Sequence, residues 1–204
     1  VCSSDLRHYI TSTNSRDVHT PANSKGFEVV FKVSEETGIP FLLHHDAEDE
    51  VLPELEEMLQ RFPNAKVVWC HVGRNKDPSK WKVFPTPDGV RRFIARHQNL
   101  YFDIAQMGSM SRFPPNSRFG GIFDAVLYYQ QPGTSKLRPE WTNIFNEYPE
   151  RFVLGSDVNT GRWGGYDEVF DRFRNSILAE VNSKAAEMIA YQNAWRLMSG
   201  EDWA

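Results

Sequence analysis

Short apolar segments that run directly into polar residues of the metal-binding type are the feature that most limits how this chain can fold. Such uninterrupted apolar runs are typical of strands buried on both faces of a parallel sheet. Three of them end in histidine or aspartate: residues 41–43 before His44, residues 67–70 before His71, and residues 152–156 before Asp157. The sequence therefore predicts buried parallel strands whose carboxyl ends carry polar side chains.

Amphipathic helical patterns separate these strands. Apolar side chains recur every three to four residues over 26–37, 48–62, 90–97 and 139–148, and two further helical patterns follow Asp157. Another strand is predicted over 100–105, with Asp103 inside it, where a buried, hydrogen-bonded carboxylate is at least as good an explanation as a catalytic one. Alternating strands and helices predict an α/β fold, and right-handed crossovers bring the carboxyl ends of its strands to one face.

Two layouts of such a sheet are open, a doubly wound sheet and a closed barrel. No glycine-rich phosphate loop follows the first strand, which argues against the nucleotide-binding version of the open sheet. The barrel is therefore preferred, but a closed barrel needs eight strands and about 250 residues. With four predicted strands in 204 residues, the chain is either an open sheet or half of a barrel.

Composition narrows the classes of function. The 204 residues are 40% hydrophobic and 25% charged, which suits one folded core, and the net charge of -4 gives no footprint for nucleic acid. No apolar run reaches the length of about 18 residues that a membrane span needs. The two cysteines, Cys2 and Cys70, have no metal-binding spacing, so we expect a reducing, cytoplasmic location.

The first residues are expected to stand apart from the fold. The opening hexapeptide, VCSSDL, resembles the translation of the end of a common sequencing adapter, and the polar stretch after it shows no period. We therefore expect residues 1–24 to be a disordered or artefactual tail, with upstream coding sequence lost, and residues 25–204 to form the domain.

The predicted strand ends have the right chemistry for a divalent metal. Neutral imidazole and carboxylate bind zinc at about 2.0 to 2.2 Å, and a catalytic site leaves one position open for water or substrate. Taken singly, each histidine could be a hydrogen-bonded structural residue, and Asp157 could cap a helix. It is their recurrence at three strand ends that favours a site over those separate explanations.

The strand motifs also resemble a known family. The segments IPFLLH, KVVWCHVG, NLYFD, RFVLGSD and NAWRL are similar, in order and spacing, to the C-terminal half of an amidohydrolase-related TIM barrel, whose members include decarboxylase-like and lactonase-like branches. The resemblance covers most of residues 27–198. It implies a parallel half-barrel of four βα units, strands five to eight of the family barrel.

The resemblance also implies roles for individual residues. His44 and Asp157 would bind a divalent metal, expected to be zinc, while His71 and Asp157 would be catalytic. His45 and Arg74 would contact substrate. The His-x-His pair of the family's first strand has no counterpart here, so this chain is expected to hold metal weakly or not at all and to be inactive by itself.

The leading functional hypothesis is a fragment of a metal-dependent hydrolase that cleaves a C–O or C–N bond of a small carboxylated substrate through metal-activated water. A non-oxidative decarboxylase of the same fold is one alternative. A non-catalytic half-barrel that serves as a binding or structural module is another. Uncovered strand edges and apolar faces would favour association, so a homo-oligomer is also expected.

Overall fold

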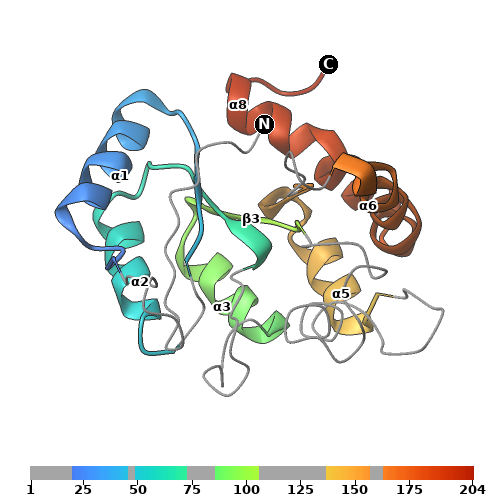
Figure 1. Ribbon diagram of the computed structural model, residues 1–204, viewed down its shortest axis with the longest axis horizontal. Helices are drawn as coiled ribbons and strands as arrows, with labels where there is room; N and C mark the ends of the chain where they lie inside the picture. The colour runs from blue at the N-terminus through green and yellow to red at the C-terminus, as the bar shows by residue number, and fades with distance from the viewer. Residues whose placement is uncertain (1–19, 46–48, 73–85, 106–136, 157–162) are drawn as a thin grey trace. The chain divides into compact units, whose positions relative to one another are not determined.

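The computed structural model describes residues 20–45, 49–72, 86–105, 137–156 and 163–204 (Figure 1). The chain divides into two compact units. The first comprises Val1–Asp103 and Trp195–Ala204, and the second comprises Ile104–Ala194.

The first unit is built on a parallel sheet. Strand β1 pairs with β2 and β2 with β3, so that Phe41 lies opposite Val67 and Val67 opposite Leu100. Helices precede and connect these strands. The elements are α1 (Lys25–Thr37), β1 (Phe41–Leu43), α2 (Leu52–Arg61), β2 (Val67–Trp69), α3 (Pro87–Arg96) and β3 (Leu100–Asp103).

Local sequence signals explain the ends of these helices. Helix α1 buries Phe27 and Phe31 and ends at Gly38, which takes the left-handed conformation (φ 72°) and donates its N–H to the carbonyl of Ser34. Helix α3 starts after Thr86, whose hydroxyl accepts the N–H of Gly89 at 3.0 Å. The predicted helices over 26–37 and 90–97 are confirmed to within a few residues.

The core of the first unit centres on Trp69. Its indole stacks on Phe102 of the next strand, with ring centroids 5.9 Å apart, and contacts Phe93 of α3 at 5.8 Å. All three side chains are buried. Burying one large apolar side chain is worth about 1.5–3 kcal/mol, so this stack anchors α3 on the sheet.

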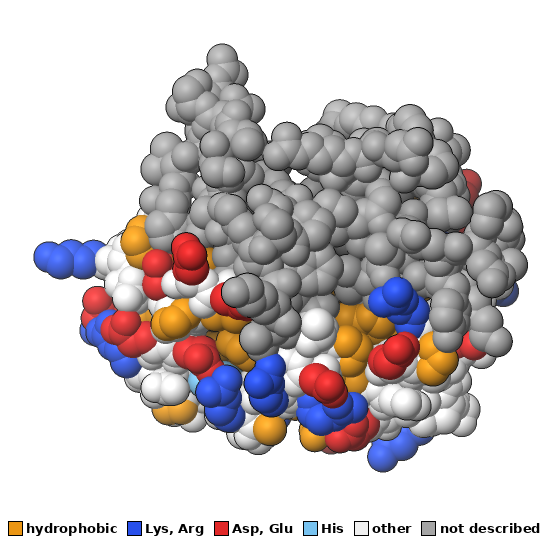
Figure 2. Space-filling view, turned by 90° about the horizontal axis from the view of Figure 1, so that it is seen from below, with side chains coloured by type: hydrophobic (Ala, Val, Ile, Leu, Met, Phe, Trp, Pro, Cys, Tyr) orange, Lys and Arg blue, Asp and Glu red, His pale blue; other side chains and the backbone are white. Residues whose placement is uncertain are grey.

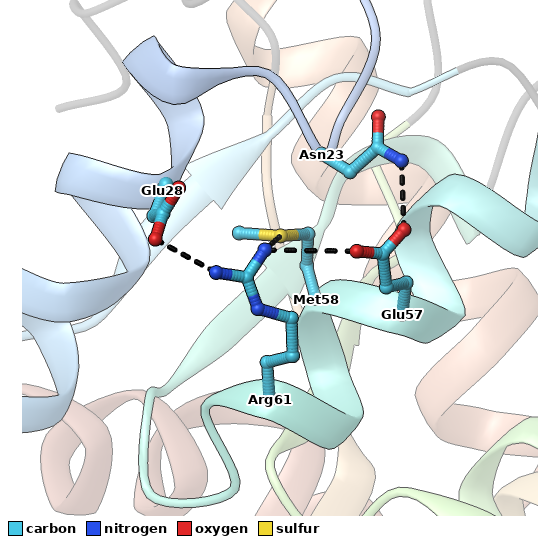
Figure 3. Close-up of polar contacts among 5 residues, drawn as sticks. All are labelled: Asn23, Glu28, Glu57, Met58 and Arg61. Atoms are coloured by element: carbon cyan, nitrogen blue, oxygen red, sulfur yellow. Dashed lines mark hydrogen bonds and ion pairs between the residues drawn. The ribbon is translucent and has the colours of Figure 1, made fainter.

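The segment before α1 is folded where it is described. The backbone N–H of Ala22, which is fully buried, donates to Glu54 Oε2 of α2 at 3.1 Å, and Asn23 donates to Glu57. Arg61 contacts Glu28 of α1 at 2.7 Å and Glu57 at 3.6 Å (Figure 3). The rest of the expected tail, residues 1–19, lies outside the described residues.

The second unit contains the last strand and most of the C-terminal helices. The carbonyl of Val153 in β4 accepts the N–H of Ile104, and Asn193 Nδ2 donates to the carbonyls of Pro149, before β4, and of Phe152, its first residue. Its elements are α5 (Pro139–Glu147), a 3₁₀ turn (Pro149–Arg151), β4 (Phe152–Val153), a second 3₁₀ turn (Trp163–Gly165), α6 (Tyr166–Arg172), a π turn (Phe173–Ile177), a third 3₁₀ turn (Leu178–Glu180), α7 (Ser183–Glu187), a second π turn (Met188–Gln192) and the start of α8 (Asn193–Ser199).

The strand order within the first unit is β1-β2-β3, with a helix between successive strands. The predicted α/β class, with a parallel sheet, is therefore confirmed. No helix in the described parts of the chain is long and apolar enough to cross a membrane. On the described surface in Figure 2, acidic and basic side chains are interspersed, so this face presents no large patch of one sign.

Candidate active site

Two histidines meet at the carboxyl ends of β1 and β2. His44 follows β1 directly, and His71 lies two residues beyond β2. Because these strands are parallel and adjacent, their ends emerge side by side, and the two Nε2 atoms lie 3.0 Å apart. The ring centroids are 4.9 Å apart. The predicted convergence of these two imidazoles at one edge of the sheet is confirmed.

The backbone around His71 is strained. His71 and Val72 have φ angles of 59° and 52°, in the left-handed region that β-branched residues rarely enter. Each such residue costs about 1–2 kcal/mol relative to the right-handed conformation. The chain therefore leaves the sheet through a turn that its own residues disfavour, and packing must hold it, since both side chains are buried.

A carboxylate from the neighbouring strand contacts this turn. Asp103, the last residue of β3, is 3% exposed, and its Oδ1 accepts the backbone N–H of His71 at 3.4 Å. A carboxylate this deeply buried is costly unless hydrogen bonds compensate it. Of the two explanations that the sequence left open for Asp103, the buried, hydrogen-bonded carboxylate agrees with this geometry, and its place beside His71 connects it to the candidate site.

The end of β1 is held by Trp69. The indole Nε1–H donates to the carbonyl of His45 at 2.8 Å, and the His45 ring lies edge-on to the indole with centroids 5.9 Å apart. His45 is 4% exposed. The sequence analysis treated Trp69 only as part of an apolar strand. A buried indole N–H usually requires an acceptor, and this requirement could have indicated a hydrogen bond from Trp69.

The imidazole pair can share a proton. At 3.0 Å one Nε2–H donates to the lone pair of the other Nε2, which requires different tautomers in the two rings. Over the described residues, no three histidine, cysteine or acidic side chains are grouped closely enough to hold a metal ion. The described residues thus contain the imidazole pair but no complete metal site.

Two predicted site residues, Asp157 and Arg74, lie outside the described residues. Asp157 follows Ser156, the last described residue after β4, and Arg74 follows the turn at Val72. Their roles as metal ligand, catalytic group and substrate contact remain predictions. The substrate contact predicted for His45 is also untested.

Another buried histidine lies at the amino end of the sheet, just before β3. Burial lowers the pKa of His97, an effect that Arg96 reinforces and that a hydrogen bond to Glu56 partly opposes. Glu56 lies 3.4 Å from His97 Nε2 and 2.7 Å from Arg96. Because the carboxyl ends of β1 and β2 carry His44 and His71, His97 belongs to a separate, structural cluster.

A parallel α/β unit whose strand ends bring two imidazoles together is the arrangement expected of a protein that binds a metal or moves protons at that edge. The family model described as "Amidohydrolase" matches residues 12–198. The chain belongs to the amidohydrolase family, whose solved relatives are TIM barrels. No curated protein matches it.

Two solved structures show the fold. One is an uncharacterized TIM-barrel protein from Bordetella bronchiseptica, with a TM-score of 0.55 and 16% identity over 87% of this chain and 52% of the other. The second is an amidohydrolase from Burkholderia multivorans with bound zinc, with a TM-score of 0.55 and 13% identity over 86% of this chain and 58% of the other. The chain thus spans about half the length of these barrels.

Proposed function

We propose that the chain supplies the second half, strands five to eight, of a TIM-barrel hydrolase that depends on a divalent metal, with zinc as the expected ion. The proposed reaction is cleavage of a C–O or C–N bond in a small carboxylated substrate. The observation that carries the proposal is the 3.0 Å separation of His44 Nε2 and His71 Nε2 at adjacent strand ends. Membership of the amidohydrolase family supports it.

The His44 imidazole fits a metal in its chemistry, because neutral imidazole binds zinc at about 2.0–2.1 Å. One donor is too few for a catalytic site, which usually has three protein ligands. We propose Asp157 as a further ligand, with the others contributed by strands that precede those described here.

In this proposal His44 holds the ion and His71 moves the proton. When bound, a divalent ion lowers the pKa of water and polarises the substrate's carbonyl group. His71 Nε2 lies 3.0 Å from His44 Nε2, so beside an ion held by His44 it would be placed to accept a proton from water or to donate one to a leaving group. Asp157 would share this work, and Arg74 and His45 would contact the substrate.

Burial of His71 supports the role proposed for it. The His71 residue is 7% exposed, whereas His44 is only partly buried. Electrostatic interactions are stronger in a desolvated environment than in water. A proton on His71 would therefore interact strongly with charge that develops beside it.

The test is zinc binding by the 204-residue chain, measured by isothermal titration calorimetry. The expected result is weak binding that the His44→Gln variant abolishes and that the His97→Gln variant, changed at the amino end of the sheet, retains. Absence of zinc binding by a complete barrel that contains this segment would contradict the proposal. So would binding that survives His44→Gln. Assays of lactones and of aromatic carboxylic acids on a complete barrel would then separate hydrolysis from decarboxylation.

A further inference from the structure

The left-handed turn after β2 places His71, so whatever stabilises that turn controls the imidazole pair. Among the described non-glycine residues, His71 and Val72 alone have positive φ. The direction in which the His71 side chain leaves the backbone depends on these angles. The 3.0 Å contact between the rings therefore depends on a conformation that the residues themselves disfavour.

The position of Asp103 explains how the turn is held. β2 and β3 are paired in parallel up to Trp69 and Phe102. Beyond that point the chain after β2 leaves the ladder, and the side-chain Oδ1 of Asp103 accepts the His71 N–H where a strand carbonyl would otherwise serve. A carboxylate is a stronger acceptor than a neutral carbonyl, and burial at 3% exposure strengthens the bond further.

We propose that Asp103 is a positioning residue, whose carboxylate holds the left-handed turn at His71 and thereby keeps the His71 imidazole facing His44. The effect of this positioning on catalysis rests on the function proposed above, but the effect on the conformation of His71 does not. The alternative is that Asp103 contributes only to stability. In that case its removal would lower the melting temperature and leave the ring contact intact.

The first test uses the unchanged 204-residue chain. Hydrogen exchange followed by NMR measures the protection of the His71 backbone N–H. The proposal expects exchange at least about a hundredfold slower than in an unstructured peptide, because the N–H is bonded and buried. Exchange at the unprotected rate would overturn the proposal without any mutation.

The second test compares three variants in the absence of metal. D103A removes the acceptor, D103N keeps an oxygen at the same place, and N99A removes two buried hydrogen bonds at the other end of β3. The readout is the nuclear Overhauser effect between ring protons of His44 and His71. The proposal expects this contact to be lost in D103A and kept in D103N and N99A, with His71 N–H protection at least tenfold lower in D103A.

Each outcome decides one question. A ring contact that persists in D103A, or that is lost equally in N99A, would overturn the positioning role. Should D103A fail to fold, the wild-type exchange rate and D103N decide, and loss of the contact in D103N would count against the proposal. Zinc binding is measured separately, so its absence in a complete barrel would contradict the proposed function and leave the result for Asp103 standing.

Discussion

The two ends of the sheet in the first unit are built differently. At the amino end, Asn99 donates both amide hydrogens to the carbonyls of Leu59 and Phe62, which closes helix α2 onto β3. At the carboxyl end, the backbone of His71 is strained and two imidazoles face each other. At the amino end, hydrogen bonds to the Asn99 side chain satisfy polar backbone groups and stabilise the fold. At the carboxyl end, a strained backbone that lowers stability places the side chains. In α/β barrels this is the usual division between stability and function.

The largest expected effect is on metal binding at the carboxyl end. The His44→Ala variant should bind zinc at least about a hundredfold more weakly, because it removes a ligand, with little change in the free energy of unfolding. Calorimetric titration and urea denaturation measure the two quantities. If the variant bound zinc as tightly as wild type, the carboxyl end of the sheet would not be the metal-binding end.

The converse change is at the amino end. Asn99→Ala removes the amide donor from the Leu59 carbonyl, and the Phe62 carbonyl keeps only the N–H of Ala65, so the free energy of unfolding should fall by about 1–3 kcal/mol. Zinc affinity should be unchanged when it is measured under conditions where the variant is folded. A loss of affinity larger than the loss of stability explains would mean that the two ends are coupled.

Trp69→Phe should affect both properties to a smaller degree. It keeps an aromatic ring in the core and removes the donor to the His45 carbonyl, so the free energy of unfolding should fall by about 1–2 kcal/mol. Zinc affinity should fall by about tenfold, because the end of β1 is no longer fixed. Trp195→Phe, at a half-exposed position, is the matched control and should change neither.

The histidine at the amino end predicts a pH dependence of stability. Burial lowers the pKa of His97 below 6.5, so above that pH the residue is neutral in both the folded and the unfolded chain and costs nothing. As the pH falls below 6.5, the unfolded chain takes up a proton first, and stability is lost until the folded pKa is passed. Urea denaturation from pH 7.5 to 5.0 should therefore show a steeper decline in wild type than in His97→Gln. Equal slopes would contradict this assignment.

The smallest expected effect is at the surface network of Figure 3. Arg61→Ala removes contacts to Glu28 and Glu57, which are exposed, and should cost less than about 1 kcal/mol. The loss should shrink further in 1 M salt, where exposed charges are screened. A salt-independent loss would indicate that packing of the arginine stem, rather than charge, is responsible.

Much of the fold could be predicted because its signals are local. The spacing of Phe27 and Phe31 followed by Gly38 defines a helix and its end within a few residues of chain. The convergence of His44 and His71 followed from the rule that parallel strand ends share one edge. Both inferences need only periodicity and chirality.

The rest depended on tertiary context. Nothing local favours a left-handed conformation at His71 and Val72, and the Asp103 contact joins residues 32 positions apart. The periodicity of the last helical patterns also did not predict which apolar side chains are buried, because Phe170 and Trp195 are 46% and 44% exposed. Sequence pattern identifies apolar side chains but not the neighbours that cover them.

The hydrogen bond from the Trp69 indole to the His45 carbonyl should affect the fluorescence of the chain. Indole emission responds to the polarity of its surroundings and to quenching by nearby protonated imidazole, and the His45 ring lies 5.9 Å away. The difference between the emission spectra of the wild-type chain and Trp69→Phe would thus report, without an added label, whether the contact between Trp69 and the end of β1 is intact.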